Sequence, residues 1–186
     1  MTVDVMLLPV TLPLERTAPP KRAPRPMDEA RFEAFYRANA GSLWSYIYRL
    51  TGNPATADDL LQKSFFRFLR ANPQAASDDH LRRYLFRTAT NLAFDHFRET
   101  KRERGHEIVI VDEGAHDSAD LRHDMMRVFA ELKPRERALL WLAHVEEQEH
   151  DDIAESLGLK SKSIRVLLFR ARKRLAELLK KKGITS

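Results

Sequence analysis

The 186-residue sequence has no cysteine, only six glycines and no long apolar run. The absence of cysteine excludes a disulfide scaffold, thiolate metal sites, iron–sulfur clusters and a cysteine nucleophile. Six glycines are too few for an all-β fold with many tight turns. No stretch reaches the ~18 apolar residues that a helix needs to cross a bilayer. These absences argue against an all-β fold and against membrane insertion.

Charged residues are plentiful, but the excess of one sign is small. The chain holds 32 Lys and Arg residues against 27 Asp and Glu residues, which gives a net charge of +5. With 43% apolar and 32% charged residues, the composition is typical of a soluble globular protein. Such an excess does not by itself indicate nucleic-acid binding, so the positions of the charges have to decide.

The first 26 residues hold six of the nine prolines. Proline removes backbone donors and favours extended chain, so we expect residues 1–27 to form a Pro-rich disordered tail. The apolar stretch from Val5 to Leu14 is similar to the core of a signal peptide, but it lacks a basic flank, follows Asp4 and is interrupted by prolines. We therefore interpret the tail as non-secretory.

Residues 28–104 carry apolar side chains at helical spacing, which predicts three helices packed into one small domain. Asp28 is placed to cap the first helix. The second helix is expected to open at Asp58 and Asp59, because acidic residues suit a helix N-terminus. Ser77 begins the third helix.

A second helical block, residues 120–182, follows a stretch at 105–119 where the helical period breaks. In this block a short helix ends at Gly158, because glycine adopts the left-handed conformation easily. Ser161 is expected to cap a longer helix directly after it, and the two helices form a helix-turn-helix. The predicted fold is all-α, with two small helical domains joined by a flexible linker and the helix-turn-helix in the second.

The two helices of this motif carry opposite charge. Residues 146–155 hold six acidic residues and no Lys or Arg, whereas residues 160–182 hold ten basic residues and one acid. Phosphates attract a basic second helix into the major groove and repel an acidic first helix into a supporting position. A basic helix alone is usually a solvated face, but together with the turn it predicts binding to duplex DNA.

The third helix of the first domain is basic as well, with seven Lys or Arg residues between positions 82 and 104. Aromatic residues lie among these charges. Such a combination suits single strands, whose bases stack on rings while cations neutralise the backbone. The alternative is that most of these rings belong to the core, and the pattern leaves both interpretations open.

Several segments of the sequence resemble, in the same order along the chain, the motifs of one protein family. The segment DDLLQKSFFRF at residues 58–68 resembles a helix that binds core RNA polymerase, and residues 81–98 resemble the adjoining promoter-melting helix. Residues 132–137, 152–158, 163–165 and 169–175 resemble the second conserved domain of the same family. From residue 28 to about residue 180, the chain therefore resembles the sigma-70 factors of the extracytoplasmic function group, also called group IV.

The resemblance implies a bacterial, cytoplasmic transcription factor that binds core RNA polymerase, recognises −35 and −10 promoter elements and promotes DNA melting. It assigns to the polymerase clamp Asp59, Gln62, Phe65 and Phe66, with either phenylalanine alternatively belonging to the core. It assigns to the −10 strand Asn91, Asp95, Arg98, Lys101 and Arg102. It assigns to the −35 element Ser161, Lys162, Ser163, Arg165, Phe169 and Arg170. The earlier helices of the second domain would contact the polymerase flap, and an anti-sigma factor is a further expected partner. Catalytic residues, a cofactor and a metal are not implied.

Two segments depart from the family pattern. Val166 and Leu167 stand where relatives usually carry a polar and a basic residue, so either the promoter differs there or this face packs on another surface. Residues 144–150 replace the usual small polar lead into the helix-turn-helix and place additional acid near the groove.

Two other functions fit parts of the pattern. His–Asp pairs at residues 116–117, 123–124 and 150–151 suggest a helical phosphohydrolase with two metals, but that chemistry needs further ligands converging from several helices. The other alternative is an ordinary helix-turn-helix regulator with a helical sensing or dimer domain, which would bind duplex DNA without polymerase.

Overall fold

The computed structural model describes residues 27–74, 77–104 and 121–184, and within these ranges every regular element is a helix. The first domain comprises α1 (Glu29–Thr51), α2 (Pro54–Ala71) and α3 (Asp78–Arg104). The second comprises α4 (Leu121–Ala130), α5 (Pro134–His144), α6 (His150–Leu157) and α7 (Ser161–Lys181). The predicted all-α fold with two helical domains is confirmed, whereas the expected tail up to residue 26 and the linker lie outside the described residues.

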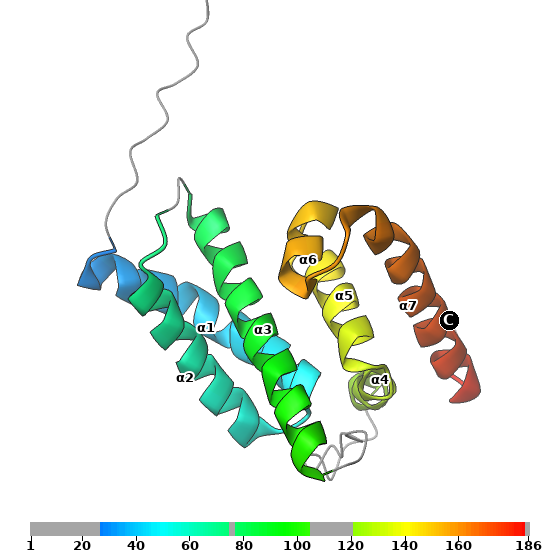
Figure 1. Cartoon of the computed structure of the whole chain (residues 1–186). Coiled ribbons are helices and arrows are strands. Elements are labelled where there is room, and N and C mark those ends of the chain that lie inside the picture. The colour runs from blue at the N-terminus through cyan, green and yellow to red at the C-terminus, as the bar shows by residue number, and fades with distance from the viewer. Residues whose placement is uncertain (1–26, 75–76, 105–120, 185–186) are drawn as a thin grey trace, which may run out of the picture.

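The first domain is a bundle of α1, α2 and α3 around an apolar core (Figure 1). Leu43 is fully buried, and the ring of Phe35 stacks on that of Phe68 with centroids 5.0 Å apart. The buried hydroxyl groups of Tyr46 and Thr90 share a hydrogen bond of 2.7 Å that links α1 to α3. Burial raises the pKa of the Tyr46 hydroxyl.

Side-chain caps fix where the first two helices begin. The Asp28 carboxylate accepts a hydrogen bond from a backbone N–H of the first turn at 2.8 Å, which confirms the predicted cap of α1. In α2 the Asn53 side chain accepts from the Thr56 N–H at 2.9 Å, and Pro54 occupies the first helical position, where its missing N–H costs nothing. The start predicted at Asp58 is therefore wrong by about one turn.

The second domain contains the predicted helix-turn-helix in α6 and α7. The chain leaves α6 at Gly158, whose φ of 62° is left-handed, and the Leu159 N–H donates to the Ala154 carbonyl at 2.8 Å. In α7 Lys160 holds the cap position and Ser161 is already the first helical residue. Ser161 therefore does not cap α7 as predicted, although the motif itself is confirmed.

The two domains pack against each other along their helices. In Figure 1, α3 stands beside the second domain, where it contacts α6, while α1 contacts α4 and α5. Arg137 of α5 is buried at this boundary, and its Nη1 donates to the Arg49 carbonyl in the last turn of α1 at 3.0 Å. Burial lowers the pKa of the Arg137 guanidinium to about 10. The sequence pattern did not predict this contact between the domains.

Candidate nucleic-acid interface

The C-terminal half of α3 presents the side chains predicted for the −10 strand. All of them are exposed: Asn91, Asp95, Arg98, Lys101 and Arg102. Most recur at three- and four-residue spacing, so they form one stripe along the helix. Within the stripe, the Asp95 carboxylate accepts a hydrogen bond from the Arg98 guanidinium. The structure thus brings an amide and several cations to one face of α3.

An open cavity of about 410 Å³ lies beside this stripe. The first domain lines it with Asn91, Phe94 and Phe97, and the second domain contributes Arg135 and Gly158. The two phenylalanine rings are half-buried with centroids 6.1 Å apart, so they belong to the core and also border the cavity. An amide and aromatic rings beside basic side chains can hold an unstacked base together with its phosphates.

The helix α7 presents a basic face on the side opposite its core contacts. The predicted −35 residues lie on α7 and are exposed except for the half-buried Ser163: Ser161, Lys162, Ser163, Arg165, Phe169 and Arg170. On the other side of the helix, Ile164, Leu168 and Ala171 are buried. A basic helix that follows a tight turn and leaves one face free has the form of a major-groove reader.

The two residues that depart from the family pattern have different environments. Leu167 is half-buried and packs against the core. Val166 is 50% exposed, and Phe169 on the next turn is 65% exposed. Packing on another surface therefore accounts for Leu167 but not for Val166, which joins Phe169 in an exposed apolar pair among cations.

The residues predicted for the polymerase clamp lie on α2 but do not all face outward. Asp59 and Gln62 are exposed, and Phe66 is 65% exposed. Phe65 is buried, with its ring centroid 4.7 Å from that of Tyr36. For Phe65 the structure favours the alternative given with the assignment, that one of the two phenylalanines belongs to the core, because α2 turns this ring inward and Phe66 outward.

The N-terminal half of α3 forms ion pairs that sequence reasoning missed. Three half-buried arginines of this half each bind an acid of the second domain: Arg82 with Glu146 at 2.6 Å, Arg83 with Asp152 at 2.8 Å, and Arg87 with Glu155. The sequence signal was the acidic run at residues 146–155, which contains no Lys or Arg of its own. These acids were expected only to keep α6 away from phosphates, and they also neutralise α3.

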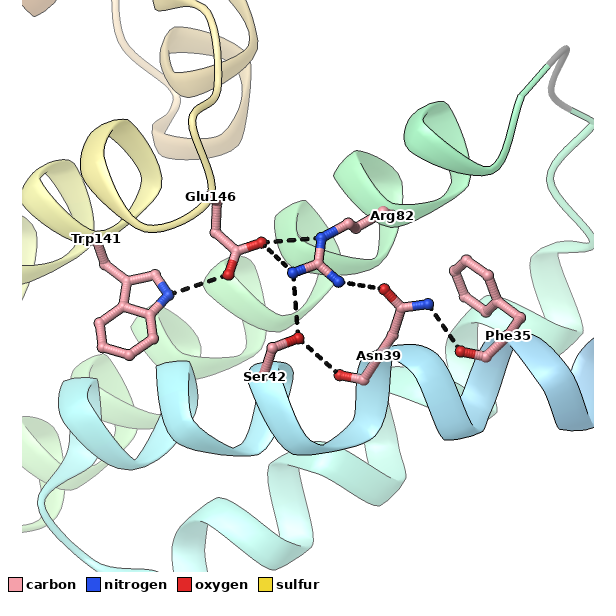
Figure 2. A network of polar contacts seen from close by, with 6 residues as sticks. All are labelled: Phe35, Asn39, Ser42, Arg82, Trp141 and Glu146. Atoms are coloured by element: carbon pink, nitrogen blue, oxygen red, sulfur yellow. Dashed lines mark hydrogen bonds and ion pairs between the residues drawn. The ribbon is translucent and has the colours of Figure 1, made fainter.

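Arg82 is the centre of a polar network between the domains (Figure 2). Its Nε and Nη2 donate to the Glu146 carboxylate at 3.0 and 2.6 Å. Nη1 donates to the side-chain oxygen of Asn39, and Nη2 also donates to the Ser42 hydroxyl at 3.2 Å. The Trp141 indole N–H donates to the other Glu146 oxygen at 3.3 Å. Because Arg82 and Trp141 both donate to the buried carboxylate of Glu146, the contact between the two domains has a defined geometry.

Neither a metal cluster nor a membrane span is found in the part of the chain that the structure describes. No three His, Asp or Glu side chains gather there closely enough to hold a metal ion. Of the three His–Asp pairs, the one at residues 116–117 and the side chains of the one at residues 123–124 lie outside what the structure describes. None of the described helices is long and apolar enough to cross a membrane.

Comparison with known families decides between the remaining interpretations. The family model for sigma-70 region 2 matches residues 35–103, and the model for sigma-70 region 4 matches residues 122–175. The chain belongs to the sigma-70 family. In a sigma-70 chain of this form, region 2 corresponds to α1–α3 and region 4 to α4–α7.

Relatives place this sigma-70 chain in the extracytoplasmic function group. It is 29% identical over 158 residues to a probable ECF RNA polymerase sigma factor, SigI, of Mycobacterium tuberculosis, with 77% of the chain and 54% of SigI covered. It is 27% identical over 160 residues to the RNA polymerase sigma-E factor of Streptomyces avermitilis, with 82% and 87% covered. The chain thus spans about half the length of SigI and most of the sigma-E factor.

Solved sigma factors share the fold. The sigma factor RpoE of Bartonella quintana, in complex with the anti-sigma factor NepR, superposes with a TM-score of 0.65 at 24% identity, covering 80% of this chain and 96% of RpoE. CnrH, in complex with the cytosolic domain of CnrY, gives a TM-score of 0.60 at 20% identity, covering 83% and 90%.

Proposed function

We propose that this sigma-70 chain is a promoter-specificity subunit that binds core RNA polymerase, recognises −35 and −10 elements and promotes melting of the DNA. One observation carries the proposal: region 2 and region 4 of a single chain each leave a basic helical face exposed, on α3 and on α7. The working compartment is the bacterial cytoplasm, and the chemistry belongs to the polymerase, so the chain itself needs no catalytic residue.

On α3, the proposed ligand is the melted strand of the −10 element. The exposed Asn91 amide can donate and accept at once, so it can read the Watson–Crick edge of a flipped base in the adjoining cavity. Arg98, Lys101 and Arg102 neutralise the phosphates on either side. These contacts exist only when the strands are separated, so they offset the cost of melting.

On α7, the proposed ligand is the major groove of the −35 element. Lys162, Arg165 and Arg170 supply charge for phosphates and base edges. The exposed apolar pair Val166 and Phe169 suits the methyl groups of thymines. This gives Val166 a role in place of the polar residue that relatives usually carry there.

Two protein partners follow from the same assignment. On α2, Asp59, Gln62 and the exposed ring of Phe66 are proposed to meet the polymerase clamp, and the first helices of region 4 to meet the flap. RpoE was solved with the anti-sigma factor NepR, which supports an anti-sigma partner for this chain as well.

The test is reconstitution with core RNA polymerase on genomic DNA, followed by sequencing of transcript starts. The expected result is a defined set of starts that share two upstream elements and vanish when the chain is omitted. Duplex binding by the chain alone with no effect on polymerase would instead favour the helix-turn-helix regulator. If chain and core enzyme do not associate, the proposal is wrong.

A further inference from the structure

An apolar pair lies in the middle of the basic face of α7. The side chain of Val166 is 50% exposed and that of Phe169 is 65% exposed. Because the two residues are three positions apart, they lie side by side on one face of the helix, with Cβ atoms about 5–6 Å apart. Leu167 turns toward the core instead. Exposed apolar side chains rimmed by charged ones mark a binding surface.

The surroundings of this pair favour DNA as its occupant. Lys162, Arg165 and Arg170 flank the pair and are all exposed. No acidic residue occurs between residues 160 and 176. Such a concentration of positive charge attracts a polyanion. In addition, α7 lies on the side of the second domain away from α1, α2 and α3, so the first domain does not cover it (Figure 1).

The position of the pair along α7 points to base edges. Val166 lies in the second turn of the helix and Phe169 in the third. In a helix-turn-helix, the N-terminal part of the second helix contacts base edges in the major groove. The apolar group that these edges present is the C5 methyl of thymine. Base pairs are stacked 3.4 Å apart, so the separation of the two side chains corresponds to one or two base steps.

Val166 differs in kind from the polar residue that relatives usually carry at this position. A polar side chain forms hydrogen bonds with a base edge and can distinguish a donor from an acceptor. The valine side chain has neither a donor nor an acceptor, so it responds to a methyl group and not to the base that carries it. Thymine and 5-methylcytosine place this methyl on the same ring carbon, C5.

We propose that Val166, with Phe169 beside it, makes α7 a reader of the C5 methyl groups of pyrimidines in the −35 element. Val166 then favours thymine and 5-methylcytosine over uracil and unmethylated cytosine. The inference rests on the proposed function, which places α7 in the major groove of that element. It adds a base preference to the function, and it makes promoter recognition responsive to methylation of cytosine at C5.

The test uses duplexes that differ by a single methyl group. Fluorescent duplexes are first selected from a pool of randomised sequence by the full-length chain, once alone and once with core RNA polymerase, and core polymerase without the chain gives the background. In the enriched sequence, each thymine is replaced in turn by uracil, which removes one methyl and keeps the base pairing. The same position is then filled by cytosine or by 5-methylcytosine opposite guanine. Fluorescence anisotropy measures the affinity of the chain for each duplex.

The test variant is Val166→Ser. Serine and valine have similar helix propensities and Val166 is half exposed, so α7 should fold as in the wild type. The control is Val145→Ser, which makes the same change at a side chain that is 55% exposed and follows α5. Should Val166→Ser not fold, Val166→Gln replaces it, because glutamine is a stronger helix former and also lacks a methyl group.

We expect uracil at one thymine position to weaken wild-type binding about fourfold, which corresponds to the burial of one methyl group. At the same position, 5-methylcytosine should bind about fourfold more tightly than cytosine. Both differences should disappear in Val166→Ser and persist in Val145→Ser. Phe169→Ala should remove the same dependence at a second thymine, one or two base pairs away.

Other results would overturn the proposal. If the wild-type chain binds uracil and thymine equally at every position, Val166 and Phe169 face a protein surface instead. Methyl differences that persist in Val166→Ser would belong to the DNA or to another residue. If neither selection enriches a duplex, the inference fails together with the −35 assignment. If the chain alone enriches a duplex but directs no transcript starts, only the proposed function fails, and the methyl differences are still measured on that duplex.

Discussion

At the scale of single residues, α3 and α7 offer nucleic acid two kinds of contact. Asn91 carries an exposed amide at the edge of a cavity, where it can discriminate one base from another. Arg170 carries an exposed charge on α7, which neutralises a phosphate or meets a base edge in the major groove. Truncating Asn91 should therefore affect melting of the promoter, whereas truncating Arg170 should affect binding of the upstream element.

Asn91→Ala should slow formation of the open complex roughly ten- to hundredfold, because a bidentate amide–base contact contributes about 1–3 kcal/mol. The contact forms only after melting, so binding to core polymerase should not change. Chemical probing of unpaired thymines measures melting, and co-elution measures assembly. Glu99→Ala, at another exposed position of α3, is the control. Equal losses in melting and assembly would contradict the role of Asn91.

Arg170→Ala should weaken binding of holoenzyme to the upstream element and lower the salt slope by about one, because one phosphate contact is lost. The slope is read from fluorescence anisotropy titrations at several salt concentrations. Lys181→Ala changes the same charge at the far end of α7 and should leave the slope nearly unchanged. A slope that stays constant in Arg170→Ala would rule out this contact.

Neighbouring residues also show where sequence reasoning ends. Phe65 and Phe66 are equally apolar, yet one is 5% and the other 65% exposed. Of the neighbours Leu167 and Val166, the leucine is half-buried against the core and the valine is exposed. Spacing predicts that one member of each pair is core, but the rotation of a helix is set by the surfaces it packs on, and these are known only once the bundle is assembled.

At the scale of helices, the ends are decided by caps and by the backbone conformation that a turn requires. The caps at Asp28 and Gly158 were predictable because each has a local cause in one side chain or one φ angle. The start of α2 was misplaced because Asn53-Pro54 reads as a break as well as a cap. Asparagine and proline occur both at breaks between helices and at the start of a helix, and only the hydrogen bonds of the backbone distinguish the two cases.

Two glycines should respond oppositely to the same substitution. Gly158 has a φ of 62° with open space around an added Cβ, so Gly158→Ala should cost about 1–2 kcal/mol of backbone strain alone. Gly41 is an exposed residue inside α1, also with open space, so Gly41→Ala should stabilise by about 0.5–1 kcal/mol. Denaturant unfolding of both variants tests this, and a stabilised Gly158→Ala would refute the left-handed turn.

The burial of the Tyr46 hydroxyl between α1 and α3 makes the stability of the chain sensitive to alkaline pH. Burial raises the pKa of Tyr46 above its unfolded value near 10, so the folded chain keeps the proton while the unfolded chain loses it. The free energy of unfolding should fall above pH 10 by up to about 1.4 kcal/mol per pH unit. This contribution is fully present below pH 10.

Tyr46→Phe provides the comparison. The lowered pKa of Arg137 acts with opposite sign at high pH, but both proteins contain it, so the difference between their unfolding curves isolates Tyr46. We expect the variant to be less stable at neutral pH, through loss of the Thr90 hydrogen bond, and to lose less stability between pH 10 and 12. Parallel curves would show that the hydroxyl ionises equally in both states.

At the scale of the whole molecule, the two domains were predictable and their contact was not. Each domain has its own apolar periodicity, which the sequence displays directly. The ion pairs between the domains depend on which surfaces meet, and an acidic run at residues 146–155 is equally compatible with exposure to solvent, repulsion of DNA or pairing with α3. The arginines that pair with this acidic run stand 64 to 69 positions away in the chain, beyond any local pattern.

Salt should distinguish the buried ion pair between the two domains from the partly exposed ones. The Arg83–Asp152 and Arg87–Glu155 pairs are partly exposed and should weaken as salt rises, whereas Glu146, 2% exposed, is screened much less. We therefore expect the radius of gyration of the free chain, from small-angle scattering, to grow only at high salt. Glu146→Gln should expand at much lower salt, because the contact that resists screening is gone, while the exposed Glu149→Gln should follow the wild type. Coincident curves for the two variants would mean that Glu146 does not hold the domains together.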